Sequence, residues 1–345
     1  MRILLVTDAW VPQVNGVVVT LRNTIACLER WGHDIRLITP EGFRTIPMPT
    51  YPEIPLALWP ARKVAAVFRE FEPEAVHIAT EGPLGLAARR YCVRHRLDFT
   101  TAYHTCFPEY VRARFGLPLA WTYAFLRWLH RPSTAVMVAT PAIHGLLRKN
   151  GFTHLAHWSR GVDTTLFKPG ARETHLPRPV FAYVGRVAVE KNIAAFLALD
   201  LPGTKLVVGD GPQRRELAQR FPRAVFVGAK SGEDLAAHYR MADVMVFPSL
   251  TDTFGLVLIE AMACGTPVAA FPVRGPIDVI TEPGVGVLDS DLRRAALEAL
   301  RLDRNAVCRY AQRYSWDHCT RQFLSHLTPA RRSGPGSALV ARQAG

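Results

Sequence analysis

The sequence predicts an α/β protein made of two doubly wound domains, each with a parallel sheet covered by helices on both faces. Short runs rich in Val and Ile alternate with helix-like stretches, which is the pattern of parallel strands joined by crossover helices. The pattern occurs twice, on either side of a strip with three prolines and a glycine, LFKPGARETHLPRP at 166–179. The length of 345 residues suits two domains of ordinary size.

Each half contributes five predicted strands. Those of the first half are RILLVTD (2–8), DIRLITP (34–40), AVHIAT (75–80), FTTAYH (99–104) and AVMVAT (135–140). Those of the second half are VFAYVG (180–185), KLVVGD (205–210), VFVGA (225–229), VMVFPS (244–249) and PVAAFPV (267–273). Between the first two strands, Leu21, Ile25 and Leu28 share one face of a predicted helix. We therefore expect an N-terminal domain (1–168), a linker (169–179) and a C-terminal domain (180–313). Ligands of such sheets bind beyond the carboxyl ends of strands, so two facing domains imply a shared cleft.

The composition is that of a soluble globular protein, with 49% hydrophobic and 21% charged residues. The first apolar run is too short for a signal peptide, and the longest weakly charged window is better read as core than as a membrane span. The six cysteines show no C-x-x-C spacing, so we expect reduced thiols and a cytoplasmic location.

The net charge of +13 comes from 42 Lys and Arg against 29 Asp and Glu. A balance of this kind favours polyanionic partners such as nucleic acid, an anionic lipid surface or phosphorylated substrates. An Arg-rich composition without functional meaning accounts for it equally well, and charge alone leaves both interpretations open.

Two motifs are candidates for phosphate contact. In VNGV (14–17), Gly16 follows the first strand and opens the first helix, where backbone N–H groups favour an anion. In YVGRVAVEKN (183–192), Arg186 and Lys191 directly follow a strand, where two cations can flank a diphosphate. The alternative for the second motif is a solvated helix start.

The segment FPSLTDTFGLVLIEAM (247–262) places two acids around a Phe-Gly pair. Asp252 lies in the turn after a predicted strand, and Glu260 lies inside a largely apolar helix. A buried carboxylate without a partner is costly, so we expect each acid to meet a polar group. The GDGP turn (209–212) is expected beside this site rather than as a contact in itself.

Taken together, these motifs resemble the retaining glycosyltransferases of family 4, which adopt the GT-B fold. The similar branch contains GDP-mannose-dependent α-mannosyltransferases and the sulfoquinovosyl- and glucuronosyl-diacylglycerol synthases. The resemblance covers about residues 1–327 and is carried by PQVNGVV, HIATEGPLG, AYHT, RGVDTTLF, GRVAVEKN, GDGP and FGLVLIEAMACGTPV, in that order. It implies that 314–327 is the terminal helix, packing back across the interdomain region. The tail 328–345 is expected to be disordered.

The resemblance assigns roles to the acids. In the family's E-x7-E motif the first acid contacts the donor sugar and the second holds the nucleotide ribose, and Asp252 and Glu260 match these positions. Phe254 would contribute to the sugar site and Lys230 to the base site. This chain departs from the family in having Asp252 where Glu is usual, so the sugar must lie closer to the loop or a water must bridge. Either change can alter the preferred donor.

The resemblance also implies a diphosphate site without a metal. The matching positions are Gly16, Arg186, Lys191, Gly255 and Leu256. Cations and a helix N-terminus would stabilise the charge on the leaving phosphate. LDSDL (288–292) contains Asp-x-Asp, which binds metal in another glycosyltransferase fold. Its place between a strand-like run and LRRAALEAL favours helix capping instead.

His104, in AYHT, matches the family's histidine near the reacting sugar. The resemblance gives it a role in orienting and polarising hydroxyl groups, with a hydrogen-bonded core histidine as the alternative. A dedicated base is not expected, because family members are thought to react on the front face with help from the leaving phosphate.

Two basic stretches of the first half are the sequence features that bear on the acceptor. The segment 108–132 mixes arginines with aromatic residues, namely Arg112, Arg114, Arg127 and Arg131 with Trp121, Tyr123, Phe125 and Trp128. A second basic stretch lies at 88–96. Docking on an anionic membrane beside a lipid acceptor fits this mixture. An ordinary amphipathic helix, with its aromatics in the core and its arginines solvated, fits it equally well.

The function expected from all this is hexose transfer from a nucleotide sugar, GDP-mannose in first place, to a glycolipid or lipid-linked glycan. The enzyme would be cytoplasmic, peripheral on the inner membrane face, and without a nucleic-acid partner. A UDP-sugar-dependent diacylglycerol glycosyltransferase of glucuronosyl or sulfoquinovosyl type is the alternative. A sugar phosphorylase is less favoured. A non-catalytic binder of anionic surfaces is also less favoured, because surface binding needs none of the site residues.

Overall fold

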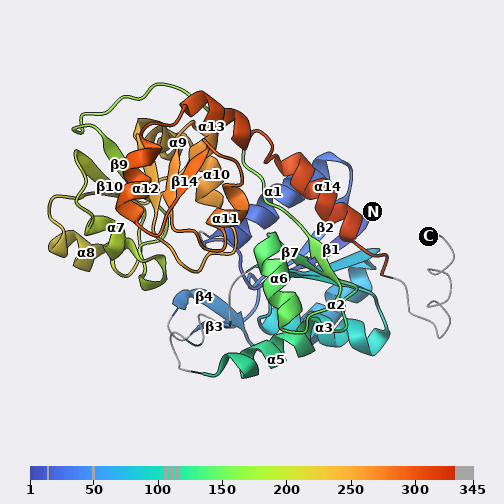
Figure 1. Cartoon of the computed structure of the whole chain (residues 1–345). Coiled ribbons are helices and arrows are strands. Elements are labelled where there is room, and N and C mark those ends of the chain that lie inside the picture. The colour runs from blue at the N-terminus through green and yellow to red at the C-terminus, as the bar shows by residue number, and fades with distance from the viewer. Residues whose placement is uncertain (14, 49–50, 105–107, 109–111, 113–116, 331–345) are drawn as a thin grey trace. The chain divides into compact units, whose positions relative to one another are not determined.

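The computed structural model describes residues 1–330 apart from 14, 49–50, 105–107, 109–111 and 113–116. Of the tail expected at 328–345, residues from 331 on lie outside the described residues, as do Cys106 and Arg114. The first three tail residues are described and held in place, since Ala330 N donates to the Glu74 carbonyl at 2.7 Å. The chain forms two compact units (Figure 1). Unit 1 comprises Met1–Ser159 and the segment from Cys319 onward, and unit 2 comprises Arg160–His318. Each contains a parallel sheet, which confirms the predicted fold class.

Unit 1 is built on a six-stranded parallel sheet in the order β2-β1-β5-β6-β7-β8. A separate antiparallel hairpin pairs β3 with β4. The strands are β1 (Arg2–Val6), β2 (Asp34–Ile38), β3 (Thr45–Met48), β4 (Tyr51–Ala57), β5 (Ala75–Ile78), β6 (Thr100–Tyr103), β7 (Ala135–Val138) and β8 (Leu155–His157). The helices are α1 (Gly16–Arg30), α2 (Ala61–Phe71), α3 (Pro83–His95), α5 (Leu119–His130), α6 (Pro141–Lys149) and the last part of α14 (Trp316–His326).

Unit 2 contains a second six-stranded parallel sheet, in the order β11-β10-β9-β12-β13-β14. Its strands are β9 (Val180–Val184), β10 (Thr204–Val208), β11 (Val225–Gly228), β12 (Val244–Phe247), β13 (Val268–Ala270) and β14 (Gly286–Leu288). Its helices are the 3₁₀ turn η1 (Val189–Lys191), α7 (Ile193–Leu197), α8 (Arg214–Arg220), α9 (Gly232–Met241), α10 (Leu256–Ala263), α11 (Pro276–Val279), α12 (Leu292–Ala299) and α13 (Arg304–Ala311).

All ten predicted strands are present, each shorter at one end or both. Most lose the polar residues at their carboxyl ends, which belong to loops. Strand β9 explains why the prediction works, since all five of its residues are buried as expected for a central strand covered on both faces. Strands β3, β4 and β8 were not predicted, and β14 was noted only as the strand-like run before LRRAALEAL. Prolines 47, 52 and 55 mask the hairpin, because proline lacks the N–H donor that a sheet ladder requires.

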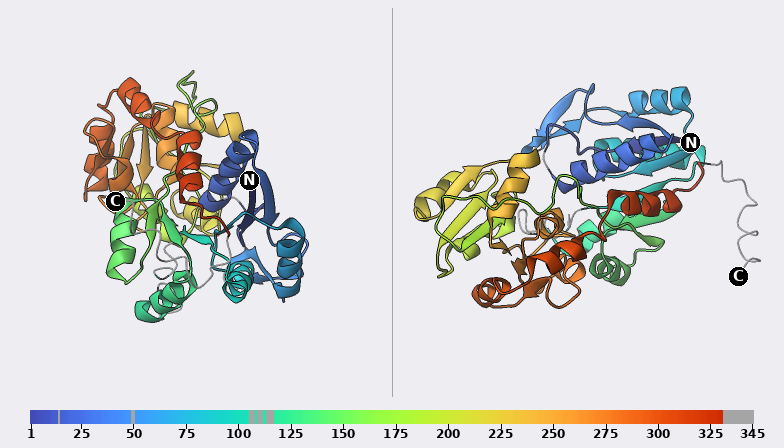
Figure 2. Two further views of the ribbon diagram at one scale, coloured as in Figure 1. Left: turned by 90° about the vertical axis from the view of Figure 1, so that its right-hand side faces the viewer. Right: turned by 90° about the horizontal axis from the view of Figure 1, so that it is seen from above.

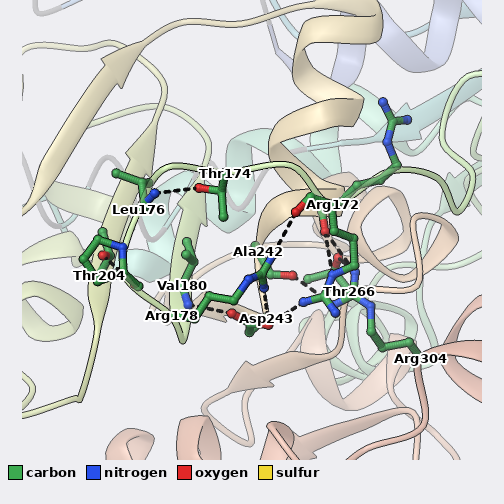
Figure 3. A network of polar contacts seen from close by, with 12 residues as sticks. Arg172, Thr174, Leu176, Arg178, Val180, Thr204, Ala242, Asp243, Thr266 and Arg304 are labelled. Atoms are coloured by element: carbon green, nitrogen blue, oxygen red, sulfur yellow. Dashed lines mark hydrogen bonds and ion pairs between the residues drawn. The ribbon is translucent and has the colours of Figure 1, made fainter.

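The strip expected as a linker (169–179) is instead fixed to unit 2 (Figure 3). The Asp243 carboxylate accepts hydrogen bonds from Arg172, from Arg178 Nη1 at 2.7 Å and from Val180 N at 2.7 Å. Beside it, the guanidinium of Arg304 donates to the Ala242 carbonyl at 2.9 Å, and burial lowers the pKa of Arg304 to about 10. The sequence could not reveal this attachment, because Asp243, which binds the strip, lies more than 60 residues further along the chain.

The chain passes from one unit to the other at Ser159–Arg160 and at His318–Cys319, rather than at the expected strip. Helix α14 begins in unit 2, where Gly161 leaves no room for a Cβ against Trp316. It ends in unit 1 alongside α1 (Figures 1 and 2), with the Arg321 guanidinium 5.5 Å from the Trp31 ring centroid. A helix at 314–327 was predicted, and the structure has one at Trp316–His326.

Candidate active site

The candidate site of unit 2 lies where the strand order changes direction. Strands β9 and β12 are neighbours in the sheet, and their connections leave toward opposite edges. In doubly wound sheets the loops after such a pair of strands form the ligand site. Lys191 follows β9 and Asp252 follows β12, so both predicted motifs reach this one place.

The two loops meet through an ion pair. The Lys191 Nζ atom lies 2.5 Å from Asp252 Oδ1, and both side chains are about four-fifths buried. Asn192, with a left-handed backbone (φ 53°), donates from Nδ2 to the Pro248 carbonyl at 3.1 Å and fixes the same two loops. The expectation that Asp252 meets a polar group is therefore confirmed, and its partner is the other predicted site residue.

The loop after β12 carries polar atoms that the described part of the protein leaves without hydrogen-bond partners. They are Ser249 Oγ, Thr251 Oγ1 and Asp252 Oδ2, all buried. Unsatisfied buried polar atoms are rare in folded proteins and cost free energy. Three on one loop, beside a lysine, form an arrangement suited to a hydroxyl-rich or anionic ligand.

Helix α10 begins directly after this loop. Gly255 precedes it with φ 86°, a left-handed conformation that strains any residue with a side chain. The ring of Phe254 is buried, with its centroid 6.0 Å from that of Tyr314. Phe254 thus anchors the turn, and the first N–H groups of α10, at Leu256 and beyond, have the orientation that favours an anion.

Glu260 lies one turn into α10 and accepts a hydrogen bond from the Tyr239 hydroxyl at 2.7 Å. Burial raises the pKa of Glu260 to about 6, and the hydrogen bond opposes that rise. Tyr239 is fully buried on α9, and its own pKa is well above the usual value because of burial and the nearby carboxylate. Sequence reasoning predicted a partner for Glu260 and missed Tyr239, since an aromatic residue on an amphipathic helix carries no sign of such a role.

Arg186 lies at the turn after β9, where its carbonyl accepts a hydrogen bond from the Tyr183 hydroxyl at 2.8 Å. The GDGP turn packs against this segment, as predicted. A Cβ on Gly209 would lie 1.9 Å from the Gly185 carbonyl oxygen, and one on Gly211 would lie 2.3 Å from that of Val187. These glycines let two backbones approach and so shape the turn after β9.

Lys230 stands apart from the other candidates. Its ammonium is 2.9 Å from Asp234 Oδ2 on α9, and this hydrogen bond keeps the pKa of Asp234 below its usual value. The side chain of Lys230 is thus engaged at the start of α9, and its predicted role toward a base stays a prediction.

In unit 1 the strand order changes direction between β1 and β5, and a buried carboxylate marks this position. Asp8 accepts hydrogen bonds from Thr80 Oγ1 at 2.9 Å, Leu84 N at 2.9 Å and Gly85 N at 3.3 Å, and so caps α3. Burial raises its pKa despite these bonds. A Cβ on Gly82 would lie 2.4 Å from Asp8 Cγ, which explains the glycine in HIATEGPLG. Asp8 was not among the predicted site residues.

The two candidates of unit 1 lie at separate strand ends. Gly16 begins α1, but Oδ1 of Asn15 already accepts from Val17 N and Val18 N at 3.0 Å each, so the side chain of the preceding residue caps the helix. His104 follows β6, is nine-tenths buried, and has its ring centroid 5.4 Å from that of Trp158. The roles of both residues stay predictions.

The described residues contain no cluster of His, Cys, Asp or Glu arranged for a metal ion. Asp291 of LDSDL accepts hydrogen bonds from Arg293 N and Arg294 N at the start of α12, which confirms the predicted cap. The described helices include none with the length and apolar character to span a bilayer. The described cysteines, at 27, 92, 264, 308 and 319, form no disulfide.

Family models match both units. The model described as Glycosyltransferase Family 4 matches residues 14–166, and the model described as Glycosyl transferases group 1 matches residues 178–303.

Relatives with curated names match most of the chain. A GDP-mannose-dependent alpha-mannosyltransferase of Mycobacterium tuberculosis is 32% identical over 83% of both chains. One of Mycolicibacterium smegmatis is 33% identical over 87% of both chains. The sulfoquinovosyl transferase SQD2 of Arabidopsis thaliana is 30% identical over 79% of this chain and 60% of its own.

Solved structures match the fold. The sucrose-phosphate synthase of Thermosynechococcus elongatus superposes with a TM-score of 0.78 at 22% identity, covering 94% of this chain and 97% of that one. The structure of Anabaena HepE in complex with UDP and glucose superposes with a TM-score of 0.69 at 16% identity, covering 94% of this chain and 98% of that one.

Proposed function

Because this chain belongs to glycosyltransferase family 4 and has the GT-B fold, we propose that it transfers mannose from GDP-mannose to a hydroxyl acceptor with retention of the anomeric configuration. The protein is a glycosyltransferase that uses a nucleotide sugar. GDP-mannose is favoured as donor because two mannosyltransferases are similar over more than four-fifths of this chain. A sulfoquinovosyl or related UDP-sugar reaction is the second candidate, supported by the similarity to the Arabidopsis enzyme.

The observation that carries the proposal is the ion pair between Lys191 and Asp252 beside the start of α10. As the nucleotide leaves, negative charge builds on its β-phosphate. In this proposal Lys191, Arg186 and the N–H groups at Gly255 and Leu256 stabilise that phosphate. No metal ion is needed in this scheme, and the enzyme is proposed to act in EDTA.

The acids serve the sugar and the ribose in this proposal. Asp252 Oδ1 binds Lys191, while Oδ2 has no hydrogen-bond partner among the described residues, so one oxygen can accept from a sugar hydroxyl. Glu260 accepts from Tyr239 through Oε2, which orients the carboxylate toward a ribose diol. Phe254 holds the turn between the two acids. His104 is proposed to orient hydroxyl groups of the reacting sugars rather than to act as the base.

The acceptor is proposed to be a glycolipid or lipid-linked glycan, which would place the enzyme in the cytoplasm at the inner face of a membrane. The test incubates the protein with GDP-mannose or UDP-sugars and a lipid extract, in EDTA, and analyses products by mass spectrometry and NMR. We expect a mannosylated lipid with an α-linkage from GDP-mannose, formed at least about 10²-fold more slowly by Asp252→Asn. Transfer only from UDP-sugars would move the assignment to the second candidate, and a β-linked product would overturn retention.

A further inference from the structure

Helix α5 of unit 1 exposes a stripe made entirely of apolar residues. Within 117–128, which includes two residues before the helix, every exposed residue is apolar, namely Leu117, Pro118, Ala120, Trp121, Ala124, Phe125 and Trp128. The side chains of Trp121, Phe125 and Trp128 are 69%, 40% and 52% exposed, and their spacing of four and three residues puts them on one helical face. We call these seven residues the α5 stripe.

The opposite face of α5 is anchored in the core of unit 1, so the exposure is built into the fold. Tyr123 and Leu126 are 3% and 0% exposed and pack in the cluster formed with β6, β7 and α6. Of the four aromatic residues noted in the sequence, only Tyr123 is therefore in the core. The expectation that all the aromatics of an ordinary amphipathic helix are buried is wrong for the other three.

A basic pocket adjoins the C-terminal end of the stripe. It has a volume of about 360 Å³, and its lining includes Arg127, Arg131, His130, Trp128 and Thr153, with no acid among the lining residues. Arg127 is held in place by donating from Nη1 to the Asn150 carbonyl at 2.9 Å. One lining residue does contact an acid, since His130 Nε2 lies 3.6 Å from Glu81 Oε1. The pocket therefore suits an anion the size of a phosphate ester.

Arginine also borders the stripe on the side of α3, which lies beside α5 at the edge of unit 1 (Figure 1). The Arg89 guanidinium lies 3.9 Å from the Trp128 ring centroid and donates to the Trp128 and Leu129 carbonyls at 2.7 and 2.9 Å. Arg90 and Arg94 of α3 are exposed.

The local sequence is cationic over a long stretch. Between Glu109 and Asp163 the chain carries no Asp or Glu, and its Lys and Arg residues there are Arg112, Arg114, Arg127, Arg131, Arg148, Lys149 and Arg160. An acid-free stretch of this length attracts an anionic surface and repels a basic one.

We propose that unit 1 docks on membranes rich in anionic phospholipid, with the α5 stripe in the acyl boundary and a lipid phosphate in the basic pocket. Tryptophan and phenylalanine favour the membrane interface, and arginine at the rim adds attraction to anionic headgroups. The charge around the stripe distinguishes this occupant from a second copy of the chain, because two such surfaces would bring like charges together. The docking is independent of the donor and of the reaction.

Vesicle co-sedimentation of the full chain, without any nucleotide sugar, tests the proposal. The wild type is expected to bind vesicles containing phosphatidylglycerol and to bind pure phosphatidylcholine vesicles at least about tenfold more weakly. Trp121→Ser with Phe125→Ser should weaken binding to the anionic vesicles by about tenfold or more. The matched control is Trp59→Ser, which removes a tryptophan that is 83% exposed outside the stripe and should bind like the wild type.

The basic pocket is tested by the double variant Arg127→Gln/Arg131→Gln. At low salt, loss of each arginine should weaken binding to the anionic vesicles by a factor of about five. The control Arg220→Gln with Arg223→Gln removes the same charge from exposed positions of unit 2 and should change little. If the double variant unfolds, the single variant Arg131→Gln, at the exposed end of the helix, replaces it as the test of the pocket.

Three outcomes overturn the proposal. They are absence of binding to anionic vesicles, equal binding to both vesicle types, and undiminished binding of the Trp121→Ser/Phe125→Ser variant. A wild type that is dimeric in light scattering, and monomeric when the stripe is changed, would assign the stripe to a second copy instead.

Discussion

The ammonium of Lys191 lies 2.5 Å from Oδ1 of Asp252, which is 61 residues further along the chain. The contact joins the loop after β9 to the loop after β12, at the point where the strand order of unit 2 reverses. One oxygen of Asp252 is thereby used inside the protein, and the other has no protein partner among the described residues. The pair sets the charge and the orientation of the proposed donor site.

Replacing Lys191 by Gln should lower kcat by a factor of about 10²–10³, the cost of losing one fixed donor to developing charge. The folded protein should persist, because glutamine can still donate to Asp252. Initial rates with saturating donor measure the effect, with exposed Lys168→Gln as the matched control. Equal rates for the two variants would remove Lys191 from the site.

Two substitutions of Asp252 separate the effect of its charge from the effect of its side-chain length. Asp252→Asn should lower kcat by about 10²-fold or more, because the amide loses the charge that pairs with Lys191. Asp252→Glu keeps that charge and adds a methylene, so it should remain active and shift the ratio of kcat/KM between donor sugars. The rates with GDP-mannose and GDP-glucose give this ratio, and Asp200→Asn, at an exposed position, is the control. An unchanged ratio would contradict the view that the shorter acid sets donor preference.

Glu260 should make stability depend on pH. Its pKa is raised from 4.5 to about 6 in the folded protein, so the ionised group opposes folding, and stability falls as pH rises through this range. At pH 8 the cost is about 2 kcal/mol, from about 1.4 kcal/mol for each pH unit. Glu260→Gln avoids that cost while still accepting from Tyr239.

Urea unfolding at pH 8 and pH 4.5 tests this expectation. Glu260→Gln should be more stable than the wild type by about 1–2 kcal/mol at pH 8, and the gain should disappear at pH 4.5. Nucleotide binding should weaken in the same variant. Exposed Glu298→Gln is the matched control and should differ by less than about 0.5 kcal/mol. A Glu260→Gln protein that is less stable at pH 8 would show that the carboxylate is not penalised.

Two helical glycines of unit 1 should respond in opposite ways to alanine. A Cβ on Gly85 of α3 would lie 2.0 Å from the Thr80 carbonyl oxygen, whereas one on Gly145 of α6 meets nothing within 4 Å. Gly85→Ala should therefore destabilise the protein by about 1–3 kcal/mol and disturb the Asp8 cap. Gly145→Ala should stabilise it by up to about 1 kcal/mol through helix propensity. Thermal unfolding of the two variants measures the difference, and the same sign for both would refute the packing argument.

The sheets were predictable because strands buried on both faces are runs of apolar residues, as in β9 and β12. The β3-β4 hairpin was not predictable, because its prolines make the sequence unlike that of a strand. The chain crossings at Ser159–Arg160 and His318–Cys319 were missed for another reason. A proline-rich strip reads as a linker, and only the fold shows Asp243 binding it.

The sequence singled out the charged residues that the structure brings together at the candidate site, but not the contacts they make. Lys191, Asp252 and Glu260 were predicted because they follow strands or lie inside an apolar helix, where a charged side chain needs a polar partner. Tyr239 did not stand out, because its hydroxyl gains meaning only from the 2.7 Å contact with Glu260. The exposure of the α5 stripe was equally hidden, since the sequence shows the period of a helix and not which face the core takes.

Protection against thermal unfolding by nucleotides, in EDTA, tests the central claim most directly. At 100 times its dissociation constant, a ligand adds about 2.7 kcal/mol of stability. We predict that GDP protects the wild type, that UDP protects it less, and that Lys191→Gln loses most of the protection at the same GDP concentration. Absence of protection by any nucleoside diphosphate, or equal protection of wild type and Lys191→Gln, would contradict the account.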